Sequence, residues 1–192
     1  PYGSVGVLGA PTIANEVRHL HQRGGSERWV EGAFFSGGLS IHARGGPVTI
    51  DHLNVSENRA DDGLNVKNAG WVTLTNSRFE GNFADQVDLD DCDGVVSGSS
   101  FVVTPGGDAN GDGLDVSLST IFVKDSGFDG QPDKGISVGE RSQVFVWKNT
   151  FKGNGNGIAV KDRSDVWLAD NSFSENTRDV AVYRKKAIFG GG

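Results

Sequence analysis

Asp112-Gly-Leu-Asp-Val116 and Lys134-Gly-Ile-Ser-Val138 are two copies of the pattern that decides the fold of this 192-residue chain. Apolar and polar residues alternate in each copy, which is the period of a β-strand with one face turned inward. Four further stretches align with them, at residues 62–66, 86–90, 156–160 and 179–183. The copies recur every 22 to 27 residues. A turn of chain this short cannot bury its inner face alone, so the copies must stack on one another.

A second set of aligned blocks lies between these copies, at residues 48–50, 72–74, 95–97, 121–123, 144–146 and 166–168. Six or seven residues after the first residue of each of the last five blocks comes a phenylalanine, the five being Phe79, Phe101, Phe128, Phe151 and Phe173. No stretch shows convincing helical periodicity. We therefore predict an all-β domain over residues 1–192, a single-stranded right-handed parallel β-helix (a solenoid) of about seven coils, with the phenylalanines stacked inside. We expect this domain to be a fragment of a longer chain.

Composition excludes several classes of protein. With one cysteine, Cys92, the chain has no internal disulfide framework, and we expect this thiol to pack as a small core or turn residue. The formal charge of −7 argues against a nucleic-acid partner, because non-specific affinity for phosphates comes from Lys and Arg. No apolar run is long enough for membrane insertion.

The Gly-Ile/Leu-x-Val strands, the Asn and Asp turns and the Phe-x-x-Asn corners resemble the repeats of the pectate-lyase-like superfamily over nearly the whole chain. More narrowly, residues 133–140, 61–62 and 183–191 are similar to β-helix regions of bacterial surface proteins that carry CotH-type, spore-coat-kinase-like domains. The resemblance implies a parallel β-helix that is secreted or on the cell surface. It assigns no activity, because this fold carries lyases, hydrolases, epimerases and adhesins alike.

Acidic residues concentrate in the middle of the chain, with nine between Glu80 and Asp115. Stacking the repeats places Asn65, Asp88 and Asp115 in one outward column, with Asp88 directly beside Asp115. Crowded carboxylates are tolerated only if they are solvated, protonated or neutralised by a cation. In one reading Asp88, Asp90, Asp112 and Asp115 bind Ca²⁺, which prefers six to eight oxygen ligands. In a second, two aspartates form an acid and base pair for glycoside hydrolysis. In a third, the acids solvate a surface and cap turns.

Basic residues follow the acidic ones, with ten Lys and Arg against six acids between Lys134 and Lys186. Lyases of the resembled superfamily use Ca²⁺ to neutralise a uronate carboxylate before an Arg or Lys removes the neighbouring proton. That resemblance makes Lys134, Lys161 and Arg163 the candidate catalytic bases. The junction of acidic and basic coils could equally keep the surface soluble or hold an anionic polymer.

Aromatic residues accumulate on another face. The expected outward column there reads Thr49, Thr73, Val96, Phe122, Phe145 and Trp167, with Trp147 beside it. Exposed aromatics in successive coils indicate a contact patch. It would bind sugar through Trp147 and Trp167, or be covered by another segment of the parent chain. Asn65, on the acidic face, is the third candidate substrate-binding residue.

Two insertions interrupt the repeat. Residues 18–35 contain His19 and His21, whose spacing is a weak metal signal, while His42 and His52 have no obvious partners in the sequence. Residues 105–111 are expected to fold over a ligand beside the acidic coils. Taken together, the sequence predicts a β-helix that contacts polysaccharide, with Ca²⁺ as a candidate cofactor and cleavage left open. The alternative is a non-catalytic structural or adhesive module whose partners are other domains of the parent.

Overall fold

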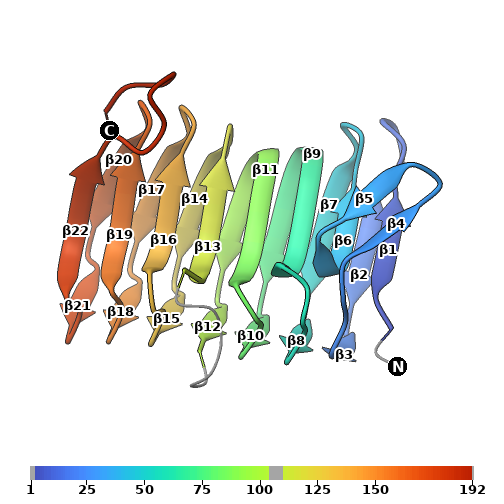
Figure 1. The fold of residues 1–192 in the computed structure, drawn as a ribbon, viewed down its shortest axis with the longest axis horizontal. Helices are drawn as coiled ribbons and strands as arrows, with labels where there is room; N and C mark the ends of the chain where they lie inside the picture. Colours follow the sequence, from blue (N-terminus) through green and yellow to red (C-terminus); the bar gives the residue numbers. More distant parts are fainter. Residues whose placement is uncertain (1–2, 104–109, 192) are drawn as a thin grey trace.

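The computed structural model describes residues 3–103 and 110–191 as a solenoid of short strands and turns (Figure 1). The expected loop at residues 105–111 lies almost entirely outside the described residues. Among those described, the structure contains no helix, and hence none that is long and apolar enough to cross a membrane. The predicted all-β class is confirmed.

The strands of successive coils stack in three parallel rows along the solenoid (Figure 1). The first row consists of β1 (Val5–Leu8), β6 (Gly37–His42), β9 (Asp62–Thr75), β11 (Asp85–Ser97), β13 (Asp112–Ser117), β16 (Lys134–Gly139), β19 (Asn156–Lys161) and β22 (Arg178–Tyr183). The second row consists of β2 (Asn15–Arg18), β7 (Pro47–Asp51), the C-terminal halves of β9 and β11, β14 (Thr120–Lys124), β17 (Gln143–Trp147) and β20 (Asp165–Ala169). The third row consists of β3 (His21–Arg23), β8 (Asn54–Ser56), β10 (Arg78–Glu80), β12 (Ser100–Val102), β15 (Gly127–Asp129), β18 (Thr150–Lys152) and β21 (Ser172–Ser174).

The core is a continuous apolar column with an aromatic ladder along it. Phe79, Phe101, Phe128 and Phe151 are fully buried and Phe173 continues the stack. Successive ring centroids are 5.5, 4.6, 5.0 and 4.9 Å apart. Near-parallel rings at this spacing follow from strand pairing, because parallel strands carry equivalent residues from coil to coil. The predicted phenylalanine ladder is confirmed.

Polar ladders at the corners satisfy the backbone where the strands turn. At one corner the Ser77 and Ser99 amides donate to the hydroxyls of Ser99 and Ser126 in the next coil, at 3.1 and 3.2 Å. The Ser126 amide then donates to Asn149 Oδ1 at 2.9 Å. Buried amides left unpaired at each corner would destabilise the fold, so Ser and Asn are required there.

One expected face assignment is wrong. Val95, not Val96, pairs with Thr73 and Phe122 in the outward column, while Val96 is fully buried. The cause is a shift of one residue in the register between β11 and β9, which occurs between Cys92 and Gly94. After the shift, Val95 points outward and Val96 points into the core. A Cβ on Gly94 would lie 2.1 Å from the Val72 carbonyl oxygen, so the irregularity depends on glycine.

The interruption of the repeat is shorter than the expected 18–35, because Arg18 ends β2 and β3 pairs with β8 in the third row. What departs from the repeat is an antiparallel hairpin, β4 (Arg28–Val30) and β5 (Ala33–Phe35), in front of the N-terminal end of the first row (Figure 1). Phe35 anchors it, being 4% exposed and stacked on His42 with centroids 4.8 Å apart. Trp29 pairs with Phe34 at the exposed side of the hairpin. The insertion therefore covers one end of the first row's outer face.

Candidate functional site

The acidic residues lie on the outer face of the first row, in the register that the repeats predict. Asp88 pairs with Asn65 on one side and with Asp115 on the other. Asp115 in turn pairs with Ser137. Parallel strands thus carry side chains separated by more than 20 residues into one column across four coils.

Three carboxylates converge on this face. Asp85, Asp112 and Asp115 each place a potential ligand oxygen within 4.8 Å of the others. Asp85 Oδ1 also accepts a hydrogen bond of 2.7 Å from the Asp112 amide. Asp85 belongs to this group of carboxylates but was not among the predicted Ca²⁺ ligands, although it aligns with Asp112 in the column just before the strand.

The other two predicted calcium ligands have different partners. Asp88 Oδ2 accepts a hydrogen bond of 2.8 Å from Asn65 Nδ2. Asp90 forms an ion pair of 2.8 Å with Lys67. Asn65 itself is fully buried, which leaves its side chain no surface to offer a sugar.

Burial dominates the electrostatics of the carboxylates. Burial raises the pKa of Asp112 to about 7, although the charge of Lys134 opposes this rise. Burial also raises the pKa of Asp85 to about 9, and the charges of Asp112 and Asp115 raise it further. The pKa of Asp88 is likewise raised well above its ordinary value, by burial first and by Asp62 next. Ionising all these groups near neutral pH therefore requires a compensating positive charge.

The candidate bases differ in their surroundings. Lys134 is 3% exposed and forms ion pairs with Asp112, at 3.1 Å, and with Asp133. Burial alone would lower its pKa, but Asp112 and Asp133 outweigh burial and raise it. Lys134 is therefore held as a cation and is poorly suited to accept a proton.

Lys161 is the candidate whose pKa moves in the direction a base requires. Its Nζ donates to Ser137 Oγ at 2.6 Å and lies 3.9 Å from Asp115 Oδ1. Burial lowers its pKa, with Asp115 opposing the shift. Arg163 is exposed in the turn after β19, between the buried Asp162 and Ser164, and its side chain packs near Gly190. The structure thus brings two predicted bases, Lys134 and Lys161, to the carboxylate group, and of these two Lys161 is the one with a lowered pKa.

The aromatic residues lie on the second row, away from the carboxylates. Phe145 and Trp167 stack with centroids 4.5 Å apart and are 39% and 47% exposed. Trp147 is more constrained, because its indole donates to Asp170 at 3.0 Å and Lys148 Nζ lies 4.2 Å from its ring centroid. Trp167 is therefore the more accessible of the two predicted sugar-stacking tryptophans.

Cys92 is buried in the core, as predicted, with its Sγ 3.1 Å from the Asp90 carbonyl oxygen. Burial raises the pKa of the thiol to about 12. A nucleophilic role is disfavoured, because the reactive form is the thiolate.

Comparison with known proteins agrees with the architecture. The family model described as right handed beta helix region matches residues 62–189. The chain belongs to the right-handed β-helix family. No curated protein matches the sequence. The expected kinship with the pectate-lyase-like superfamily and with CotH-type proteins stays a prediction.

A solved structure shares the fold of this β-helix. It is the full-length tailspike protein 2 from Escherichia coli O157:H7 bacteriophage CAB120, with a TM-score of 0.58 and 20% sequence identity. The alignment covers 72% of this chain and 19% of the tailspike chain. At this identity the likeness concerns the fold alone.

Proposed function

We propose that this β-helix is part of a surface protein and binds an acidic polysaccharide through Ca²⁺ on the outer face of the first row. The observation that carries the proposal is the convergence of Asp85, Asp112 and Asp115 within 4.8 Å on a strand face. Ca²⁺ is the fitting cation, because it takes six to eight hard oxygen ligands and tolerates irregular geometry. The three carboxylates would supply part of this shell, and water with a uronate carboxylate would supply the rest.

The shape of the face suits a linear polymer. Successive coils repeat the same outward positions about 4.8 Å apart along the solenoid. Such solenoids present extended surfaces rather than closed pockets. Asp115 and Lys161 lie next to each other on this face, so a bound uronate would meet both a bridging cation and an ammonium or amine group.

A second candidate activity, cleavage by β-elimination, is favoured by Lys161. Its lowered pKa increases the fraction of neutral amine, which can accept the proton from C5 of a uronate. The C5–H electron pair would form the C4=C5 double bond as the C4–O bond breaks, and the departing oxygen would take a proton from water. Replacing such a base typically slows turnover by about 10² to 10⁴-fold.

The alternative role is that of a non-catalytic module. In this role, another domain of the parent protein covers the exposed, stacked rings of Phe145 and Trp167. Exposed apolar patches often form such contacts. This role requires neither Ca²⁺ nor Lys161.

Affinity electrophoresis in gels containing polygalacturonate or alginate tests the proposal. We expect the protein to be retarded in the presence of Ca²⁺ and to migrate normally with a chelator, and Asp115→Asn to abolish the retardation. Asp129→Asn, which changes an exposed acid on the third row, is the matched control and should be retarded like the wild type. Normal migration both with and without Ca²⁺ across a polyuronate panel would contradict acidic-glycan binding and favour the non-catalytic module, and retardation that persists in chelator would contradict the role of Ca²⁺.

A further inference from the structure

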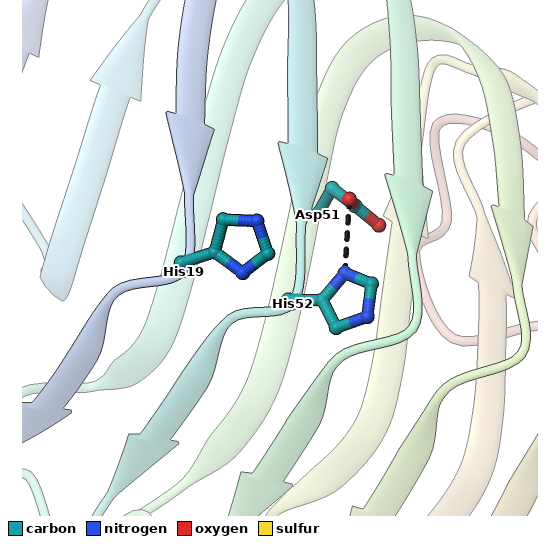
Figure 2. Close-up of side chains that lie close together, drawn as sticks. All are labelled: His19, Asp51 and His52. Atoms are coloured by element: carbon teal, nitrogen blue, oxygen red, sulfur yellow. Dashed lines mark ion pairs between the residues drawn. The ribbon is translucent and has the colours of Figure 1, made fainter.

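His19, Asp51 and His52 meet at the corner between the second and third rows (Figure 2). β2 pairs with β7 so that Arg18 lies beside Asp51, and the next residues, His19 and His52, come together although 33 positions separate them in the sequence. Both histidines have left-handed backbones, with φ of 51° and 53°. The same corner conformation in neighbouring coils sends both rings to the same side.

The three side chains face one another closely enough to contact one metal ion together. His52 Nδ1 lies 2.9 Å from Asp51 Oδ2, and the His19 ring points toward this pair (Figure 2). The two imidazole centroids are 5.0 Å apart. One potential ligand atom from each residue lies within 4.8 Å of the other two. Tetrahedral Zn²⁺ with bonds of about 2.0 to 2.1 Å places its ligands roughly 3.4 Å apart, so rotation of exposed side chains can complete the site.

The carboxylate is already oriented by the next coil. Asp51 Oδ1 accepts hydrogen bonds from Thr75 Oγ1 at 2.7 Å and from Asn76 Nδ2 at 3.0 Å. These bonds leave Oδ2 turned toward His52. The hydrogen bonds from Thr75, His52 and Asn76 also lower the pKa of Asp51, so the group is a carboxylate across the physiological range. Carboxylates that ligate metals are typically held in place by such hydrogen bonds from neighbouring residues.

One competing cation lies nearby. Arg18 Nη1 is 3.6 Å from Asp51 Oδ2, beyond normal hydrogen-bond distance. Arg18 also contacts Glu16 at 3.3 Å, so it keeps a carboxylate partner if a metal ion takes Asp51.

We propose that His19, Asp51 and His52 bind a late first-row divalent cation such as Zn²⁺, with water in the remaining position. Two imidazoles and one carboxylate are ligands that Zn²⁺ and its neighbours prefer, whereas Ca²⁺ prefers oxygen alone. The ion would join the N-terminal coil, which carries His19, to the next coil, which carries Asp51 and His52. The site is thus a clip between coils and is separate from the carboxylates of the first row.

Isothermal titration of chelator-treated protein with ZnCl₂ tests the clip. We expect one Zn²⁺ per chain and a loss of affinity of at least about 100-fold in His19→Gly and in His52→Gly. Glycine is the suitable replacement because Gly98 occupies the equivalent corner in its own coil, with φ of 58°. Circular dichroism and the melting temperature without metal establish that each variant folds.

Two controls separate this site from others. His21→Gln changes an exposed histidine on the same coil, and Asp112→Asn changes the first-row carboxylates, so both should bind Zn²⁺ like the wild type. Zn²⁺ should also slow amide hydrogen exchange in β2 and β7 of the wild type but not of His19→Gly. No uptake by the wild type, or unchanged uptake by the folded His19→Gly and His52→Gly proteins, would overturn the proposal.

Discussion

The side chain of Lys161 lies across Gly139 of the preceding coil, so closely that a Cβ at position 139 would come 2.9 Å from Lys161 Cε. This path carries Nζ back to Ser137 Oγ, 2.6 Å away, and toward Asp115. The absence of a side chain at position 139 therefore sets where the candidate base lies.

Gly139→Ala should displace Lys161 with little effect on stability, because the clash involves the end of a flexible side chain. If the β-helix cleaves polyuronate, the formation of unsaturated uronate, followed by its ultraviolet absorbance, should fall at least about 10-fold, approaching the loss in Lys161→Ala. Gly127→Ala is the matched control, since its Cβ would meet only the Thr150 hydroxyl at 3.3 Å on the third row. Equal turnover in Gly139→Ala and wild type would show that Lys161 does not depend on this packing.

Stability should fall as the pH rises when no divalent cation is present. The pKa of Asp62 and of Asp112 is about 7 and that of Asp85 about 9 in the folded chain, against an ordinary value of 3.8. The folded state therefore binds more protons than the unfolded state. The resulting stabilisation is complete below about pH 4. It is lost progressively from there up to the folded pKa, which is about 7 for Asp62 and Asp112 and about 9 for Asp85, by up to about 1.4 kcal/mol per pH unit for each group.

Urea denaturation in a chelator at pH 5 and at pH 8 measures this effect. We expect a lower midpoint at pH 8, recovery of that midpoint with Ca²⁺, and a smaller pH effect in Asp85→Asn. A midpoint at pH 8 equal to or above that at pH 5 would refute this account of the carboxylates.

The aromatic ladder should dominate the stability of the core. Phe128 is 1% exposed and lies between Phe101 and Phe151, at 4.6 and 5.0 Å. Phe128→Ala should lower the free energy of unfolding by about 3 to 5 kcal/mol, since it removes a buried ring and leaves a cavity. Phe145→Ala, in the exposed stack on the second row, should cost no more than about 1 kcal/mol. Similar losses in the two variants, measured by chemical denaturation, would contradict this assignment of core and surface.

Asn76→Gly tests the orientation of Asp51 in the proposed metal clip. Asn76 holds Asp51 Oδ1 at 3.0 Å and has φ of 50°, so glycine preserves the backbone while removing the hydrogen bond. We expect Zn²⁺ affinity to fall about 10 to 100-fold, which is the usual loss when a residue that hydrogen-bonds a metal ligand is removed. Unchanged affinity in calorimetry would mean that Asp51 needs no such support.

The repeat made much of the fold predictable. Alignment of Leu64, Val87 and Leu114 places the strands in register, and the register alone brings Asp88 beside Asp115. The ladder from Phe79 to Phe173 follows from the same periodicity. Features that recur in every coil can be predicted from the sequence, because parallel pairing places equivalent residues of successive coils side by side.

The departures from the repeat were not predictable in this way. The shift near Gly94 reversed the expected roles of Val95 and Val96, since an irregularity of one residue leaves no mark in the spacing of apolar residues. The proximity of His19 and His52 could not be predicted from the sequence, because the hairpin insertion obscures the alignment of the first coil with the second. The register places Asn65 beside Asp88 and Lys67 beside Asp90, but which of these neighbours bond to one another depends on rotamers, which spacing does not give.

Calorimetric titration of the chelator-treated protein with CaCl₂ near pH 8 tests the central claim most directly. We predict uptake of one Ca²⁺ per chain with a dissociation constant between about 10⁻⁵ and 10⁻³ M. Asp85→Asn and Asp115→Asn should lose this uptake, while Asp129→Asn and His19→Gly should retain it. No heat of binding in the wild type, or equal binding in folded Asp85→Asn and Asp115→Asn proteins, would contradict calcium-assisted glycan binding at these carboxylates.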